Sequence, residues 1–83
     1  MNFLPAVVRA EYREKFLIQL TFNDGTERAV DFAPWLSGPA FDPLKELEYF
    51  RRFFLDGGTV CWPNGADIAP ETLYEEARSR RAA

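Results

Sequence analysis

Three carboxylates near the end of the chain come closest to a catalytic arrangement. Asp67 is followed by Glu71 and Glu75, and two carboxylates in unequal environments can divide the roles of general acid and general base. Aspartate and glutamate are also favoured in turns and at the start of helices, because of local hydrogen bonding and the helix dipole. The pattern therefore favours a structural role, and a small enzyme that uses Asp67 with Glu71 or Glu75 is kept as an alternative.

The chain has one cysteine and no histidine. Histidine is the usual general base and the commonest metal ligand, so neither a metal site nor another cofactor is expected. Cys61 stands between Val60 and Trp62 with no cationic neighbour, which predicts a buried and unreactive thiol. A lone cysteine cannot form an intramolecular disulfide, and this favours a reducing, cytoplasmic setting.

An antiparallel meander is predicted in the first part of the chain. Apolar and polar residues alternate over residues 16–22, which is typical of a strand with one buried face. The Asn-Asp-Gly segment at residues 23–25 favours a tight turn, and residues 26–32 supply the partner strand. Residues 6–10 are β-prone and are expected to form the first strand, with the connection to the second at residues 13–14.

Two helices are predicted on either side of a second hairpin. From Pro43 the apolar residues recur at every third position, which favours a helix with Pro43 at its first position and Asp42 as its N-cap. The β-prone residues 53–55 and 59–62 flank an Asp-Gly-Gly turn and predict the hairpin. Pro70 is expected to begin the last helix.

The composition indicates one small folded domain over residues 1–83. Aromatic residues make up 16% of the chain, and each buries about 150–250 Å². The expected fold class is α+β: an antiparallel three-stranded meander, a short helix, a second β-hairpin and a C-terminal helix. No apolar run approaches the ~18–20 residues that cross a bilayer, so a membrane partner is not expected.

The charge balance bears on the choice of partner. The net charge is −3 and the isoelectric point is about 4.9, which opposes the non-specific phosphate attraction that dominates nucleic-acid affinity. The basic cluster of Arg78, Arg80 and Arg81 is interpreted as a solvated helix end, which the helix dipole favours. A nucleic-acid accessory role through these arginines is the other alternative.

Two tryptophans beside loops are the candidates for a binding surface. Tryptophan combines a large apolar area with one hydrogen-bond donor and is enriched at binding hot spots, although each indole also fits the core of a small domain. Asn64 is expected to shape the turn after the second tryptophan. The hypothetical partner-binding residues are Trp35, Trp62, Asn64, Asp67 and Tyr74.

The chain resembles the bacterial DUF2442 family over nearly its whole length. The resemblance lies in residues 20–25, 30–32 and 38–44 and, most specifically, in the closing segment 59–74. It implies a small α+β domain without an established activity. Some members carry a fused helix-turn-helix segment, and their genes often neighbour those of a short family suspected of toxin–antitoxin roles. Because the sequence ends at Ala83, such a DNA-reading helix pair is not expected in this chain.

The expected function is therefore a non-enzymatic protein-interaction module. The resemblance implies a small protein partner, such as the product of an adjacent gene, in a toxin–antitoxin-like pair. The acidic balance suits a basic partner, because complementary charges speed encounter and select against wrong partners. Part of the aromatic surface near Trp35 or Trp62 is expected to stay exposed, which would also permit a symmetric homodimer.

Overall fold

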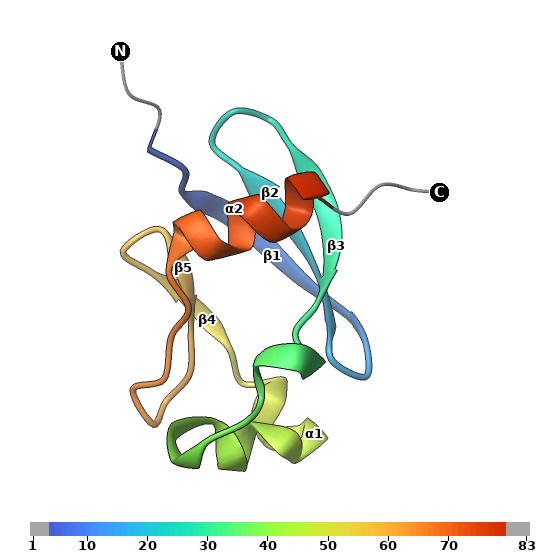
Figure 1. The fold of residues 1–83 in the computed structure, drawn as a ribbon, viewed down its shortest axis with the longest axis vertical. Coiled ribbons are helices and arrows are strands. Elements are labelled where there is room, and N and C mark those ends of the chain that lie inside the picture. The colour runs from blue at the N-terminus through green and yellow to red at the C-terminus, as the bar shows by residue number, and fades with distance from the viewer. Residues whose placement is uncertain (1–3, 80–83) are drawn as a thin grey trace.

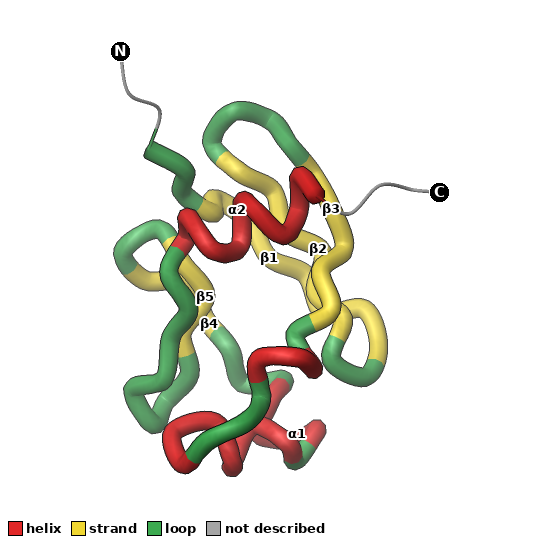
Figure 2. Tube along the Cα trace, viewed as in Figure 1, coloured by secondary structure: helices red, strands yellow, loops and turns green. Residues whose placement is uncertain are grey.

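The computed structural model describes residues 4–79 of the chain (Figures 1 and 2). The strands are β1 (Val7–Glu14), β2 (Leu17–Phe22), β3 (Glu27–Asp31), β4 (Phe54–Asp56) and β5 (Thr59–Cys61). The α-helices are α1 (Leu47–Phe50) and α2 (Pro70–Ser79), and two 3-10 helices, η1 (Ala33–Trp35) and η2 (Pro39–Lys45), precede α1. The predicted α+β class is confirmed. None of the helices in this described part is long and apolar enough to span a membrane.

The meander has the strand order β1-β2-β3 and is antiparallel throughout. Its inner face is built by the alternation that the sequence predicts, because Ile18, Leu20 and Phe22 are fully buried while their neighbours in β2 are not. Ile18 pairs with Val30 of β3. The outer face of this sheet is polar, as is common for an antiparallel sheet with one solvated face.

Strand β1 is longer than predicted. The expected connection at residues 13–14 is wrong, because these residues belong to β1 and the turn lies at Lys15, which has a φ of 49°. The register between β1 and β2 is irregular between Val7 and Arg9 and between Tyr12 and Glu14. Such bulges interrupt strict alternation, which explains why the sequence pattern identified only the first part of the strand.

The second hairpin, β4–β5, is confirmed. Its turn consists of Gly57 and Gly58, whose φ angles are 62° and 81°, as a two-residue type I′ turn requires. The hairpin contacts the beginning of β1, where the Val7 N–H donates a 2.7 Å hydrogen bond to the Gly58 carbonyl. In Figure 1 the hairpin lies at the left of the meander, and α2 crosses in front of the strands.

The predicted first helix is short and begins later than expected. Pro43 lies inside η2, and Asp42 is also within η2, where it forms a 3.2 Å ion pair with Lys45. Extended backbone at Glu46 separates η2 from α1. Residues around Pro43 form i→i+3 bonds, such as the one from the Glu46 N–H to the Pro43 carbonyl, because proline removes a donor that a continuous α-helix needs.

The core lies between the inner face of the meander, the β4–β5 hairpin and α2. Helix α2 contributes Leu73 and Ala77, both fully buried, while Tyr74 is half-buried. The Thr59 hydroxyl, buried in β5, donates to the Ile68 carbonyl and so ties β5 to the segment before α2. These contacts fix the position of the turn that joins β5 to α2.

Candidate interaction surface

Trp62 belongs to the core and not to the surface. Its side chain is 1% exposed, its ring centroid lies 5.6 Å from that of Phe50 and 5.9 Å from that of Phe32, and its Nε1–H donates a 2.8 Å hydrogen bond to the Phe50 carbonyl. An indole that is packed and hydrogen-bonded in this way offers no surface to a partner in this conformation. The core interpretation of Trp62 is correct, and a partner contact through its indole would require the core to open.

The turn after Trp62 is held by its own hydrogen bonds. The Gly65 N–H donates to the Trp62 carbonyl and the Trp62 N–H to the Ala66 carbonyl, both at 2.9 Å. The Asn64 Oδ1 atom accepts a 3.0 Å bond from the Ala66 N–H, and Gly65 has a φ of 90°. This is a type I turn followed by a left-handed glycine, a common three-residue loop. Asn64 and Gly65 therefore shape the turn, as predicted.

Trp35 is half-buried at the end of η1. Its ring stands edge-on to Phe32, with centroids 5.2 Å apart and an interplanar angle of 85°. This contact holds one side of the indole while part of its surface remains accessible. Of the two tryptophans, Trp35 alone retains the mixed character expected of a surface contact.

Tyr74 ties α2 to the β2–β3 turn. Its hydroxyl donates a 2.6 Å hydrogen bond to Asp24 Oδ2, and its ring packs edge-on against Phe22 with centroids 5.1 Å apart. The bond lowers the pKa of Asp24, with help from the Thr26 N–H, and the same bond together with desolvation raises the pKa of Tyr74. Tyr74 thus has a structural partner within the chain.

The three candidate catalytic carboxylates are not placed in contrasting environments. Asp67, Glu71 and Glu75 are all exposed, and the backbone of Asp67 forms an antiparallel bridge with Cys61. General acid–base pairs act through contrasting environments, which three exposed carboxylates do not provide. Among residues 4–79, no group of three or more histidine, cysteine, aspartate or glutamate side chains is placed to hold a metal ion.

Cys61 is half-buried, so the prediction of a fully buried thiol is wrong in degree. Cys61 is paired with Phe54 at the open end of the β4–β5 hairpin, and its Sγ atom lies 3.7 Å from the Asp56 carbonyl oxygen. Desolvation raises the pKa of the thiol, and the negative charges of Asp67 and Asp56 raise it further. This environment opposes the thiolate form that a nucleophile needs.

The predicted basic cluster is only partly described. Arg78 is exposed, with its guanidinium 5.9 Å from the centre of the Tyr74 ring. Arg80 and Arg81 lie outside the described residues. The contact with Tyr74 is a cation–π arrangement and gives Arg78 a role within α2.

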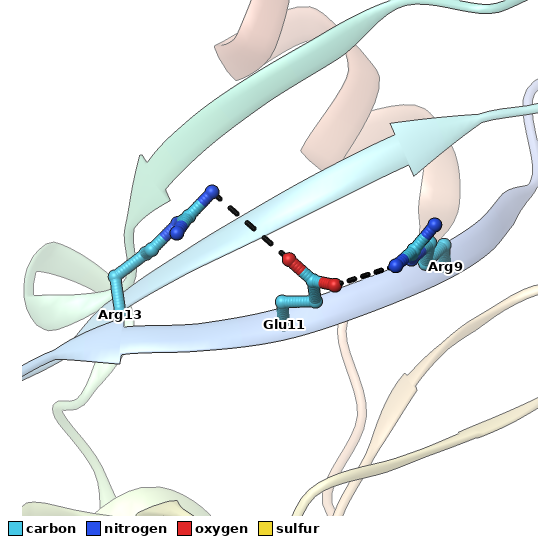
Figure 3. Close-up of polar contacts among 3 residues, drawn as sticks. All are labelled: Arg9, Glu11 and Arg13. Atoms are coloured by element: carbon cyan, nitrogen blue, oxygen red, sulfur yellow. Dashed lines mark hydrogen bonds and ion pairs between the residues drawn. The ribbon is translucent and has the colours of Figure 1, made fainter.

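The outer face of the meander carries a charged hollow of about 160 Å³. Figure 3 shows Glu11 between two arginines, with 2.7 Å to Arg9 and 4.0 Å to Arg13. Exposed pairs of this kind contribute about 0–1 kcal/mol. Both signs of charge mix here, so the face favours neither an anionic nor a cationic ligand. The lining residues are Arg9, Glu11, Arg13, Gln19, Thr21 and Glu27.

Strand β4 is the apolar region that sequence reasoning missed. All three of its residues are exposed, including Phe54 at 45% and Leu55 at 37%, whereas Thr59 and Val60 of the paired β5 are buried. Adjacent strand residues point to opposite faces, so β4 presents an apolar side chain on each face. The signal in the sequence was the run of three large apolar residues at 53–55, which places apolar side chains on both faces of a strand.

Other large apolar side chains are also exposed, but they are dispersed over separate elements. Leu4 precedes β1, Val8 lies in β1 and Leu47 begins α1. Single apolar side chains at a surface are ordinary. Two in succession on a sheet edge are not, because such edges recruit further strands.

Comparison with known proteins gives a family and no closer relative. The family model described as "Protein of unknown function (DUF2442)" matches residues 7–79. No curated protein matches the chain. No solved structure matches it either.

Proposed function

The chain belongs to the DUF2442 family of proteins of unknown function, and we propose that it is a non-enzymatic protein-interaction module that binds through β4. The exposed pair Phe54 and Leu55 is the observation that carries this proposal. Aromatic side chains are enriched at interfaces and dominate their energetics. Trp35 and Asp67, from the originally expected surface, are exposed in part or in full and are proposed as peripheral contacts.

The partner we propose is a small basic protein, such as the product of an adjacent gene, in a toxin–antitoxin-like pair. The chain carries a net charge of −3, and Asp56 and Asp67 place negative charge beside the β4–β5 hairpin. Charge complementarity at an interface increases the association rate and selects among partners. The lone cysteine supports a reducing, cytoplasmic setting for this complex.

The test is the affinity of the purified chain for the product of the adjacent gene, measured by calorimetry. Phe54→Glu is expected to weaken binding by about ten-fold or more, because it places a charge at the centre of the apolar contact. Leu47→Glu is the matched control, since Leu47 is 41% exposed in α1. It should bind as the unchanged chain does.

Equal affinities for Phe54→Glu and Leu47→Glu would contradict the proposal. So would a partner whose binding is abolished only by substitutions at Asp67 or Trp35. Circular dichroism melting of each variant separates lost binding from lost folding. Light scattering of the chain alone shows whether the exposed pair is used by a second copy.

A further inference from the structure

We infer that β4 binds its partner by strand addition: an extended segment with apolar residues and a lysine or arginine pairs with β4 opposite Leu55. This inference rests on the proposed function and specifies its chemistry. It requires three properties of β4, namely a free backbone edge, apolar side chains on both faces and a charge that selects the segment. Each is present in the described part of the chain.

The backbone polar groups of Leu55 are directed away from β5. The two-residue loop is closed by Asp56 and Thr59, the hydrogen-bonded pair of such a hairpin, and Leu55 lies opposite Val60 in the next position. Hydrogen-bonded and non-hydrogen-bonded pairs alternate along an antiparallel ribbon. The Leu55 N–H and carbonyl therefore point away from β5, and among residues 4–79 β4 is paired in a sheet with β5 alone.

The edge strands β1 and β4 differ in how well they are protected against pairing with a further strand. Strand β1 carries Arg9, Glu11 and Arg13 and has two register irregularities, and both charges and bulges discourage further pairing at an edge. Strand β4 is only three residues long and has no bulge; it carries Phe54 and Leu55, and its one charged residue, Asp56, is at the turn end. An added strand would place its side chains beside Phe54 on one face and Leu55 on the other, which is how strand addition obtains specificity.

The charge around β4 selects the sequence of the segment. Asp56 ends β4 at the turn, whereas Asp67 bridges Cys61 at the open end of the hairpin, on the side of β5 away from β4, so Asp56 is the acidic residue at the turn end of β4. Arg51 and Arg52 precede the strand, and the Arg51 guanidinium lies 4.9 Å from the centre of the Tyr12 ring. A basic residue of the added segment is therefore expected beside Asp56, at the end where the charge is uncompensated.

Hydrogen exchange of the Leu55 amide, measured by NMR, tests the inference directly. The probe is a capped seven-residue peptide of alternating valine and lysine. At saturating peptide, exchange at Leu55 should slow by about ten-fold or more, because a free amide becomes hydrogen-bonded. The Phe54 amide, already directed toward β5, should change much less, and a peptide with glutamate in place of lysine should bind more weakly.

Two variants separate strand addition from a side-chain contact. Leu55→Pro removes the N–H on the free edge, where proline is tolerated, and Leu55→Ala removes the side chain but keeps the N–H. Strand addition predicts that Leu55→Pro binds the valine–lysine peptide about ten-fold more weakly than Leu55→Ala. Melting curves of both variants verify folding.

Several results would overturn strand addition. These are absence of peptide binding, binding without slowed exchange at Leu55, equal affinities of the two variants, or preference for the glutamate peptide. Protection of Leu55 that rises with protein concentration and accompanies a dimer in light scattering would make a second copy the occupant. If the adjacent gene's product still binds in a Phe54-dependent way, the proposed function stands while strand addition falls.

Discussion

The turn at residues 62–66 and strand β4 differ in how distinctive their sequences are and in how exposed their apolar side chains are. The turn lies in the most specific segment of the chain, yet it places Trp62 in the core and uses Asn64 and Gly65 for its own hydrogen bonds. Strand β4 has only three ordinary residues, but it is exposed throughout. A distinctive segment can therefore serve folding, while binding is assigned to an ordinary strand that is paired in a sheet along one edge.

The turn at residues 22–26 supports this view of the 62–66 turn. The Phe22 N–H bonds to the Thr26 carbonyl at 2.8 Å and the Gly25 N–H to the Phe22 carbonyl at 2.9 Å. The Asp24 Oδ1 atom accepts from the Thr26 N–H at 2.9 Å, as Asn64 does from the Ala66 N–H. The same local chemistry thus builds two turns in one chain, which marks it as structural.

Truncation of Trp62 should have the largest effect on stability. Trp62→Ala removes the ring contacts with Phe32 and Phe50 and leaves the Phe50 carbonyl without its donor. The expected loss is about 3–5 kcal/mol of unfolding free energy in urea titrations. Trp35→Ala, at a half-buried site, should lose less unfolding free energy than Trp62→Ala. A loss below about 1 kcal/mol for Trp62→Ala would contradict its core role.

Substitution of Gly65 should have the second-largest effect on stability. Gly65→Val forces a β-branched residue into a φ of 90°, which costs about 1–3 kcal/mol. Gly25→Val, at a φ of 91° in the equivalent turn, should show a comparable fall in melting temperature. Gly65→Asn should lower the melting temperature less than Gly65→Val does, because asparagine tolerates the left-handed region better than valine. An unchanged melting temperature for Gly65→Val, combined with lost binding, would make the turn a binding site.

The bond between Tyr74 and Asp24 should make stability depend on pH at both extremes. The lowered pKa of Asp24 contributes stability above the ordinary value of 3.8, and this is lost as the pH falls through the folded-state pKa. The raised pKa of Tyr74 contributes stability below the ordinary value of 10.0, and this is lost as the pH rises through the folded-state pKa. Tyr74→Phe should remove the alkaline dependence and weaken the acid one, because the Thr26 N–H still donates to Asp24.

Urea midpoints measured across the pH range check this prediction. Tyr49→Phe is the matched control, because it removes the hydroxyl of another half-buried tyrosine. It should keep the pH profile of the unchanged chain. If the urea midpoints of Tyr74→Phe and of the unchanged chain fell in the same way as the pH is lowered, the Tyr74 hydroxyl would not stabilise the Asp24 carboxylate.

Truncation on β4 should have the smallest effect on stability. Phe54 is 45% exposed, so Phe54→Ala should lose less than about 1 kcal/mol. Binding to the adjacent gene's product should nevertheless weaken. This is the reverse of the behaviour expected at Trp62. A large stability loss for Phe54→Ala, measured by urea titration, would place Phe54 with the core.

The sequence predicted the elements whose patterns are local. Alternation in residues 16–22 identified β2, paired glycines identified the turn at Gly57 and Gly58, and Pro70 marked the start of α2. The sequence did not predict where β1 ends, because bulges break the alternation. It also did not predict the position of α1. These depend on pairing partners and on how Pro43 interrupts hydrogen bonding.

The candidate surface was less predictable than the fold. Trp62 and Phe54 have similar apolar character, and the sequence pattern does not state which of them meets the core. Their exposure is set by long-range packing: Phe32 and Phe50 cover Trp62, while β5 is the one strand within residues 4–79 that pairs with β4. The family match at residues 7–79 confirms the resemblance but adds no site.

Hydrogen exchange of the complex with the adjacent gene's product tests whether β4 is the binding surface. Mass spectrometry of the chain alone and in the complex would compare the peptides that cover residues 53–57 and 62–67. Binding through β4 predicts slower exchange over residues 53–57, with residues 62–67 already protected and unchanged. Slower exchange over residues 62–67, with unchanged exchange over residues 53–57, would place the binding surface at the Trp62 turn and exclude β4.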